Sequence, residues 1–264
     1  MRKFFDFFKK IDKKYYSIIG SILFLGSIVV IGIIILNKGT IMSASSYDGE
    51  TFKNEYESLN NRLSDGENKY PKVNITFENI KYISITEALN MLTPGIGMEG
   101  TGAIYIGYAE CIYCRSAVQV LVDTARESAI DKIYYLDISE VWDEKEVNFD
   151  GNVVTNQEPH ADYYKFVERL GNEYTKEYIL YDKDGNEVKI NTRRVEAPLV
   201  IFVVDGKIVS SNVGTLFSQG DPYTPLNDDQ VAGLSEIYGY GLRDVVEGID
   251  YFKSLELERK NSQQ

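Results

Sequence analysis

Residues 103–127 read AIYIGYAECIYCRSAVQVLVDTARE, and this stretch decides the fold class. Its opening, AIYIGY, is a short apolar run of the kind found in central strands. Apolar residues then recur at helical spacing between residues 116 and 129, which predicts a helix that begins at about Cys111. The two cysteines of the chain, Cys111 and Cys114, therefore lie at the junction between a strand and a helix.

Strand and helix patterns alternate around this junction. Residues 73–84 predict a partly buried strand, and residues 84–92 predict a helix that starts with a capping box. Residues 132–139, KIYYLDIS, predict a further strand after the helix that follows the cysteines. Alternation of this kind implies βαβ units with a parallel sheet core.

The carboxyl-terminal part of the chain has a different pattern. Residues 198–213 read PLVIFVVDGKIVSSNV, two apolar runs around an Asp-Gly turn, which predicts a β-hairpin. From about residue 227 the tail is predicted to be helical, in two pieces separated near Gly239 and Gly241.

Residues 141–195 fit neither the βαβ pattern before them nor the hairpin and helix after them, and we interpret them as an insertion. They hold a helix candidate at 161–174 and a hairpin candidate at 178–190. The predicted fold class is therefore α/β, with one domain at about 70–260 whose insertion separates a βαβ half from a ββα half.

The position of the cysteines suggests redox chemistry. A thiol at the amino terminus of a helix meets unpaired N–H groups and the positive end of the dipole, which stabilise the thiolate and lower a pKa of about 8.5. Cys111 is the predicted nucleophile toward a client disulfide, and Cys114, one turn later, is the predicted resolving thiol.

Two other interpretations of the cysteine pair remain open. A structural disulfide would gain little from so short a loop, because the chain-entropy stabilisation grows with loop length. A zinc site needs about four ligands, and besides the pair the chain holds a single histidine, His160. We expect neither a metal nor another cofactor.

Over about residues 73–245 the sequence resembles the thioredoxin superfamily. The resemblance rests on AIYIGY, the motif CIYC with its following helix, KIYYLDIS, and Glu196-Ala197-Pro198 before LVIFVVDGKIV. It implies a thioredoxin-like fold, thiol-disulfide oxidoreductase activity, and a catalytic set of Cys111, Cys114 and Pro198. Pro198 would match the family's cis proline, which lies against the active-site disulfide; the simpler alternative is a trans proline that begins a strand.

A narrower resemblance is to bacteriocin transport accessory proteins, through IGYAECIYCRSAVQVL and GKIVSSNVGTLFSQGDPYTPL. The chain also departs from the common thioredoxin pattern. Tyr105 stands where a buried acid is usual, Glu110 replaces the tryptophan before the first cysteine, and Ile112-Tyr113 replaces Gly-Pro. Proton transfer at Cys114 would then need another group.

The amino-terminal residues predict a membrane anchor. Residues 1–15 form a basic segment, in which residues 1–14 carry a formal charge of +4, and residues 16–36 form an uncharged apolar run about long enough to span a bilayer. The positive-inside rule then places the amino terminus in the cytoplasm and the domain outside it. A cleaved signal peptide, with a site near residues 43–45, is the alternative. Residues 37–69, rich in polar residues, are predicted to be a tether with at most a short helix at 52–63.

The formal charge of −12 argues against nucleic acid as a partner, since phosphates demand clustered Lys and Arg. The expected partners are exported proteins or peptides with thiols or disulfides, a redox partner that resets the pair, and the lipid bilayer around residues 16–36. Because disulfides persist outside the cytoplasm, oxidase or isomerase activity is favoured over reduction. The alternative function is a non-enzymatic binding module with a structural disulfide.

Overall fold

The computed structural model describes residues 44–216 and 218–262. The predicted basic segment at 1–15, the anchor at 16–36 and the first part of the predicted tether lie outside these residues. In the part of the chain that is described, no helix combines the length and the apolar character needed to cross a bilayer.

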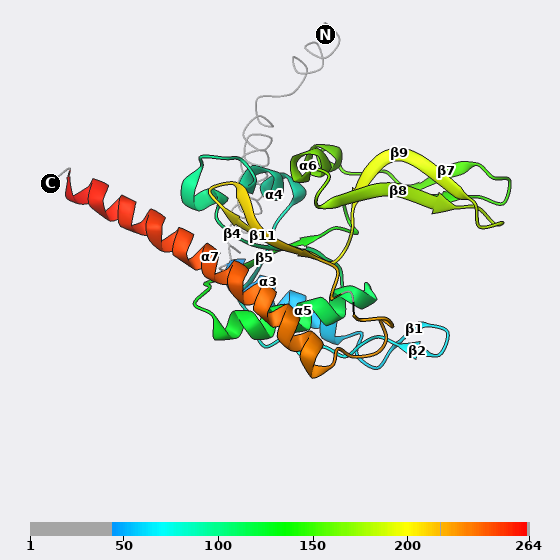
Figure 1. The fold of residues 1–264 in the computed structure, drawn as a ribbon, viewed down its shortest axis with the longest axis horizontal. Helices are drawn as coiled ribbons and strands as arrows, with labels where there is room; N and C mark the ends of the chain where they lie inside the picture. The colour runs from blue at the N-terminus through cyan, green and yellow to red at the C-terminus, as the bar shows by residue number, and fades with distance from the viewer. Residues whose placement is uncertain (1–43, 217, 263–264) are drawn as a thin grey trace, which may run out of the picture. The chain divides into compact units, whose positions relative to one another are not determined.

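A five-stranded mixed sheet forms the centre of the domain (Figure 1). Its strands are β3 (Ile80–Tyr82), β4 (Gly102–Gly107), β5 (Ile133–Asp137), β10 (Leu199–Val204) and β11 (Lys207–Val213). Their spatial order is β11-β10-β4-β5-β3. Both β3 and β4 pair with β5 in parallel, whereas β10 is antiparallel to its neighbours β4 and β11. The predicted parallel half and the predicted hairpin half thus join in one mixed sheet, and the fold is mixed α/β.

Helices cover both faces of this sheet (Figure 1). One face packs against α3 (Ala44–Glu57), α5 (Ile112–Glu127) and α7 (Asp228–Asn261). The other packs against α4 (Ile85–Met91) and α6 (Tyr163–Leu170), with the short 3₁₀ helix η1 (Gly97–Gly100) before β4. In β4, Tyr105 enters the first core while Ile104 and Ile106 enter the second, and all six residues of the strand are buried. A strand that is buried on both faces explains why AIYIGY has no polar alternation.

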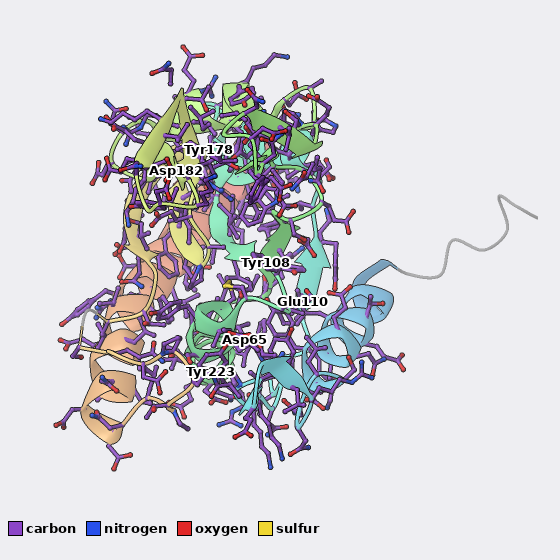
Figure 2. The ribbon with its side chains drawn as sticks, turned by 90° about the vertical axis from the view of Figure 1, so that its right-hand side faces the viewer. Asp65, Tyr108, Glu110, Tyr178, Asp182 and Tyr223 are labelled. Atoms are coloured by element: carbon purple, nitrogen blue, oxygen red, sulfur yellow. A yellow bond between two sulfur atoms is a disulfide. The ribbon has the colours of Figure 1, made fainter. Side chains whose placement is uncertain are left out.

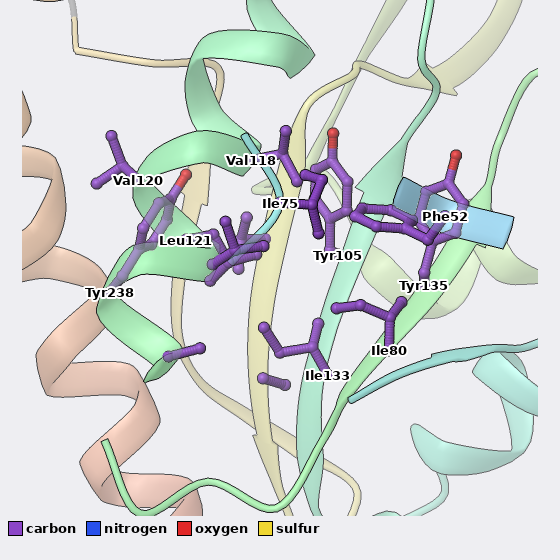
Figure 3. Packing of buried hydrophobic residues seen from close by; sticks show 14 of the residues in the cluster. Phe52, Ile75, Ile80, Tyr105, Val118, Val120, Leu121, Ile133, Tyr135 and Tyr238 are labelled. Atoms are coloured by element: carbon purple, nitrogen blue, oxygen red, sulfur yellow. The ribbon is translucent and has the colours of Figure 1, made fainter. Parts of the chain in front are cut away.

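The described part of the predicted tether is folded onto the domain. Helix α3 begins well before the short helix predicted at 52–63, and a small hairpin of β1 (Leu63–Asp65) and β2 (Asn68–Lys69) follows it. Phe52 and Tyr56, one helical turn apart, have no exposed surface. Figure 3 shows Phe52 beside Tyr105 and Tyr135 of the central strands. The prediction of a free tether is wrong for this stretch, because two buried aromatic residues hold the helix against the sheet.

Residues between β5 and β10 form the insertion that the sequence predicts. It contains α6 and the strands β6 (Glu144–Val147), β7 (Val153–Gln157), β8 (Thr175–Tyr181) and β9 (Glu187–Val195). The predicted hairpin is present as β8–β9 and is longer than expected, whereas the β6–β7 hairpin was not predicted. The predicted helix at 161–174 ends earlier because Gly171, with φ of 78°, follows its last residue.

Two further expectations need correction. The strand predicted at 73–84 is regular only in β3, although Val73 and Ile75 are buried as strand residues would be. The tail is a single helix, α7, and does not break at Gly239 or Gly241. A Cβ atom on Gly241 would lie within 2.1 Å of Phe202 Cδ2, so this glycine permits close packing of α7 on β10.

Candidate functional site

Cys111 and Cys114 form a disulfide at the start of α5, with 5.0 Å between their Cα atoms. Cys111 is the N-cap of the helix, and its Sγ accepts a hydrogen bond of 3.1 Å from the backbone N–H of Cys114. The Cys114 side chain is fully buried, whereas Cys111 is half-buried. The sequence predicted this asymmetry, in which the first sulfur can be approached from solvent and the second lies inside the fold.

The loop before β10 lies against the exposed sulfur. The Ala197–Pro198 peptide bond is cis, as the resemblance implied, and Pro198 is buried. The carbonyl oxygen of Ala197 lies 3.7 Å from Cys111 Sγ. The three residues predicted to form the site, Cys111, Cys114 and Pro198, therefore meet at one place.

Tyr105, at the position where the thioredoxins that the sequence resembles have an acid, is a buried neutral group. Its hydroxyl lies 2.7 Å from the hydroxyl of Tyr56 and donates a hydrogen bond of 3.3 Å to the carbonyl oxygen of Cys114. Burial raises the pKa of Tyr105 far above its ordinary value. Tyr105 therefore stabilises the first turn of α5 through its hydrogen bond to Cys114, and it does not act as a base near neutral pH.

Arg115 is also structural, although it directly follows the motif. Its guanidinium is fully buried and donates hydrogen bonds to the carbonyl oxygens of Pro71 (2.6 Å) and Ala109 (3.1 Å) and to Asn60 Oδ1 (2.7 Å). Burial lowers the pKa of Arg115. These bonds tie the first turn of α5 to the segment that follows α3, so the prediction of a free tether also missed a support of the cysteine pair.

An acidic cavity of about 770 Å³ opens beside the cysteines. Its carboxylate-bearing lining residues are Glu55, Glu110, Asp137, Glu140 and Glu144. Figure 2 shows Glu110 and Tyr108 next to the disulfide. Negative charge at this place disfavours a thiolate on Cys111, whereas the helix terminus favours it. Glu55 and Asp137 come from α3 and the end of β5, so no local motif marks them.

Two carboxyl groups in this cavity resist ionisation. Burial raises the pKa of Glu55 and of Asp137, and repulsion from Glu110 and Glu140 raises both further. Opposing this, Tyr82 donates a hydrogen bond to Glu55, and Ser139 donates two to Asp137. The pKa values of both carboxyl groups remain above their ordinary values.

On the other side of Tyr108 a groove of about 510 Å³ separates the cysteine region from the β8–β9 hairpin. Tyr108 and Trp142 form an edge-to-face pair, with 5.3 Å between ring centroids, and both line the groove and the acidic cavity. Ala197, whose carbonyl oxygen lies 3.7 Å from Cys111 Sγ, also lines the groove. Trp142, which belongs to the insertion, therefore lies near the predicted active site.

Among the described residues, no group of three or more His, Cys, Asp or Glu side chains is placed to hold a metal ion. His160 accepts a hydrogen bond on Nδ1 from the backbone N–H of Asp162 and so takes part in the start of α6.

The raised pKa of Asp137 gives a testable pH dependence. A carboxyl whose pKa is higher in the folded than in the unfolded state destabilises the fold once pH rises above the unfolded value, about 3.9. Asp137→Asn should therefore raise the urea midpoint at pH 7, and the gain should disappear as pH falls below about 3.9. The asparagine Oδ1 can still accept both hydrogen bonds from Ser139.

Asp182→Asn is the matched control with the opposite sign. Hydrogen bonds from Asn186 and from neighbouring backbone N–H groups lower the pKa of Asp182, which stabilises the fold above its unfolded pKa. This variant should be no more stable than the native chain at pH 7. Equal gains in both variants, or a gain for Asp137→Asn that persists at low pH, would contradict the electrostatic account.

Comparison of the chain with protein-family models, with curated proteins and with solved structures found no match.

Proposed function

We propose that this protein is a thiol-disulfide oxidoreductase of the thioredoxin-like kind, acting through Cys111 and Cys114 on exported proteins or peptides. The observation that carries the proposal is the asymmetric pair at the start of α5, in which half-buried Cys111 caps the helix and is disulfide-bonded to buried Cys114. The Ala197–Pro198 loop, which lies against Cys111, supports it, as does the mixed sheet with a parallel half and an antiparallel hairpin half.

Thiol-disulfide exchange through Cys111 and Cys114 proceeds in two steps, each of which breaks one S–S bond and forms another. In the reducing direction the Cys111 thiolate attacks a client disulfide, forms a mixed disulfide, and displaces one client sulfur as a thiolate. The Cys114 thiolate then attacks Cys111 Sγ, which releases the second client sulfur and leaves the protein oxidised. Run backward, the same two steps oxidise a client dithiol and leave the protein reduced, so a redox partner must reset the pair after each turnover.

The hydrogen bond from Cys114 N–H to Cys111 Sγ supports the choice of nucleophile. A sulfur that accepts a backbone N–H at a helix terminus gains more from that bond as a thiolate than as a thiol. Cys114 is buried, so it can reach Cys111 but not a large client.

A membrane-anchored, extracytoplasmic arrangement belongs to the same proposal. It rests on the basic residues 1–15 and the apolar run at 16–36. Disulfide chemistry outside the cytoplasm favours oxidation or isomerisation. The resemblance to bacteriocin transport accessory proteins supports secreted, disulfide-containing peptides as one client class.

A second candidate is a binding module in which the disulfide is only structural. The acidic cavity beside Cys111 and the neutral Tyr105 favour it, because neither assists proton transfer in the manner of the usual buried acid. The two candidates differ in whether the folded protein can be reduced and whether Cys111 is then reactive.

Alkylation of the reduced protein tests this difference. The full chain, in detergent micelles, is reduced with excess dithiothreitol and reacted with iodoacetamide across a pH series, with each cysteine quantified by peptide mass spectrometry. Cys111 should react at least ~10-fold faster than Cys114, with a pH midpoint below the ordinary thiol value of about 8.5. A disulfide that is reduced only when urea unfolds the chain would instead support the binding module.

A further inference from the structure

The groove that Ala197 lines contains a guanidinium that lies close to two aromatic rings. Arg194, on β9, has its Cζ 4.5 Å from the ring centroid of Trp142 and 4.5 Å from that of Tyr178 (Tyr178 is labelled in Figure 2). All three residues line the groove. Cation–π attraction to two rings holds the guanidinium in place without using its N–H groups, which stay available for hydrogen bonds.

Those N–H groups have no carboxylate partner in the described part of the chain. Two acids line the groove, and each is paired with a lysine: Glu196 with Lys176 at 2.5 Å and Glu177 with Lys189 at 3.4 Å. Neither acid forms an ion pair with Arg194, and no hydrogen bond between its side chain and another described residue is found. A half-buried guanidinium without a protein carboxylate partner suits bidentate binding of a planar anion.

We propose that Arg194 is a specificity-determining residue, which binds a carboxylate that a client peptide carries close to its reactive cysteine. The inference rests on the proposed function, because the groove leads to Ala197, whose carbonyl oxygen lies 3.7 Å from Cys111 Sγ. Arg194 precedes Ala197 by three residues, a span of at most about 11 Å along the chain. An extended client therefore presents its carboxylate within about three residues of its cysteine.

The acidic cavity on the other side of Tyr108 and Trp142 determines in which orientation a client with an acidic residue binds across the site. Five acidic residues and a single arginine, Arg62, line that cavity, so its acids outnumber its basic residue, and an acidic client side chain is disfavoured there relative to the groove. A client with an acid near its cysteine is thus accepted in one orientation across the site. The cavity and the groove, which share the Tyr108–Trp142 pair, together select the orientation in which an acidic client binds.

Fluorescence of Trp142 gives a direct test that needs no redox turnover. Trp142 is the single tryptophan of the chain and stacks on Arg194, so a ligand that binds the guanidinium should change its emission. The probe is an amidated Ala-rich peptide with Ser in place of Cys and a Glu two residues away, titrated into the full chain in detergent micelles. The comparison peptides replace Glu with Gln or Lys, or carry no acidic side chain but a free terminal carboxylate at the same distance.

The Glu peptide should bind at least 10-fold more tightly than the Gln and Lys peptides, and Arg194→Gln should remove this preference. Arg194→Lys, which keeps the charge but not the planar fork, should retain only part of it. Arg243→Gln is the matched control, since Arg243 stacks on Tyr240 at 4.7 Å on α7, outside the groove, and this variant should keep the full preference. Tighter binding of the free-terminus peptide than of the amidated Glu peptide would show that Arg194 binds the terminal carboxylate of a client and not an acidic side chain.

Equal affinity for the Glu and Gln peptides, or a Glu preference that survives in Arg194→Gln, would overturn the inference. A circular dichroism spectrum and unfolding midpoint of each variant separate loss of binding from loss of folding. Because the probe peptides contain no cysteine, these outcomes are independent of whether Cys111 exchanges disulfides. Failure of the alkylation test with a retained Glu preference would contradict the proposed function and leave the carboxylate site in place.

Discussion

Replacement of Cys114 with serine should trap a persistent mixed disulfide between Cys111 and a client, whereas replacement of Cys111 should abolish exchange. The first variant keeps half-buried Cys111, the proposed nucleophile, but lacks the buried thiol that is proposed to resolve the intermediate. The second keeps a thiol that has no exposed surface and so cannot reach a client disulfide. In a turnover assay each variant should lose roughly three orders of magnitude of rate, since both thiols are needed for a complete cycle.

The two variants are compared in the full chain with a disulfide-containing model peptide, and adducts are separated on non-reducing gels and identified by mass spectrometry. The double variant, without either thiol, sets the background. Adducts of equal yield with Cys111→Ser and Cys114→Ser would contradict the assignment of nucleophile and resolving thiol. Turnover that survives in the double variant would show that the activity belongs to other groups.

Phe52→Ala should destabilise the protein by about 3–5 kcal/mol, the cost typical of removing a large aromatic side chain from a core. Phe52 has no exposed surface and packs against the rings of Tyr56 and Tyr135, with centroid distances of 4.7 and 4.8 Å. Figure 3 shows Phe52 next to Tyr135. Its loss would leave a cavity between α3 and the sheet, directly beneath the hydrogen bond that joins Tyr56 to Tyr105. Urea unfolding of the full chain, monitored by circular dichroism, measures the change.

Phe149→Ala is the matched control, because Phe149 is 82% exposed and its removal should change the free energy of unfolding by less than about 0.5 kcal/mol. Equal effects of the two substitutions would mean that α3 does not contribute to the core. The chain would then be arranged as the sequence alone suggested, with a free tether before the domain.

The contrast between Phe52 and AIYIGY explains which elements the sequence could predict. In β4 every residue is buried, so the apolar run is continuous and its identity as a central strand follows from composition alone. In α3 two aromatic residues separated by three polar ones carry the packing, and such a sparse pattern is also typical of a tether. The sequence therefore located the sheet but not the helix α3, which packs on one face of it.

Gly241 illustrates a different limit. A glycine within an apolar helical pattern signals either a break or a close approach, and the sequence does not distinguish between them. In the structure α7 continues through Gly241. A Cβ atom at this position would collide with Phe202, so the glycine marks a close approach between α7 and β10 and not a break in the helix.

The candidate site divides in the same way. Cys111 and Cys114 are three residues apart and could be assigned from local spacing, and Pro198 could be assigned through the family resemblance. The surroundings come from distant segments: Glu55 from α3, Asp137 from β5, and Trp142 and Arg194 from the insertion. No periodicity or motif brings these residues together, so the acidic cavity and the groove became visible only in the folded structure.

The most direct test of the central claim is the redox equilibrium of Cys111 and Cys114 in the full folded chain. The protein is equilibrated with glutathione and dithiothreitol buffers of defined potential, acid-quenched, and its free thiols are quantified by mass. Our account predicts a reversible two-electron transition between about −120 and −270 mV, with the less reducing part of this range expected for an oxidase or isomerase. A pair that stays oxidised in every buffer until the protein unfolds would contradict the account and identify the disulfide as structural.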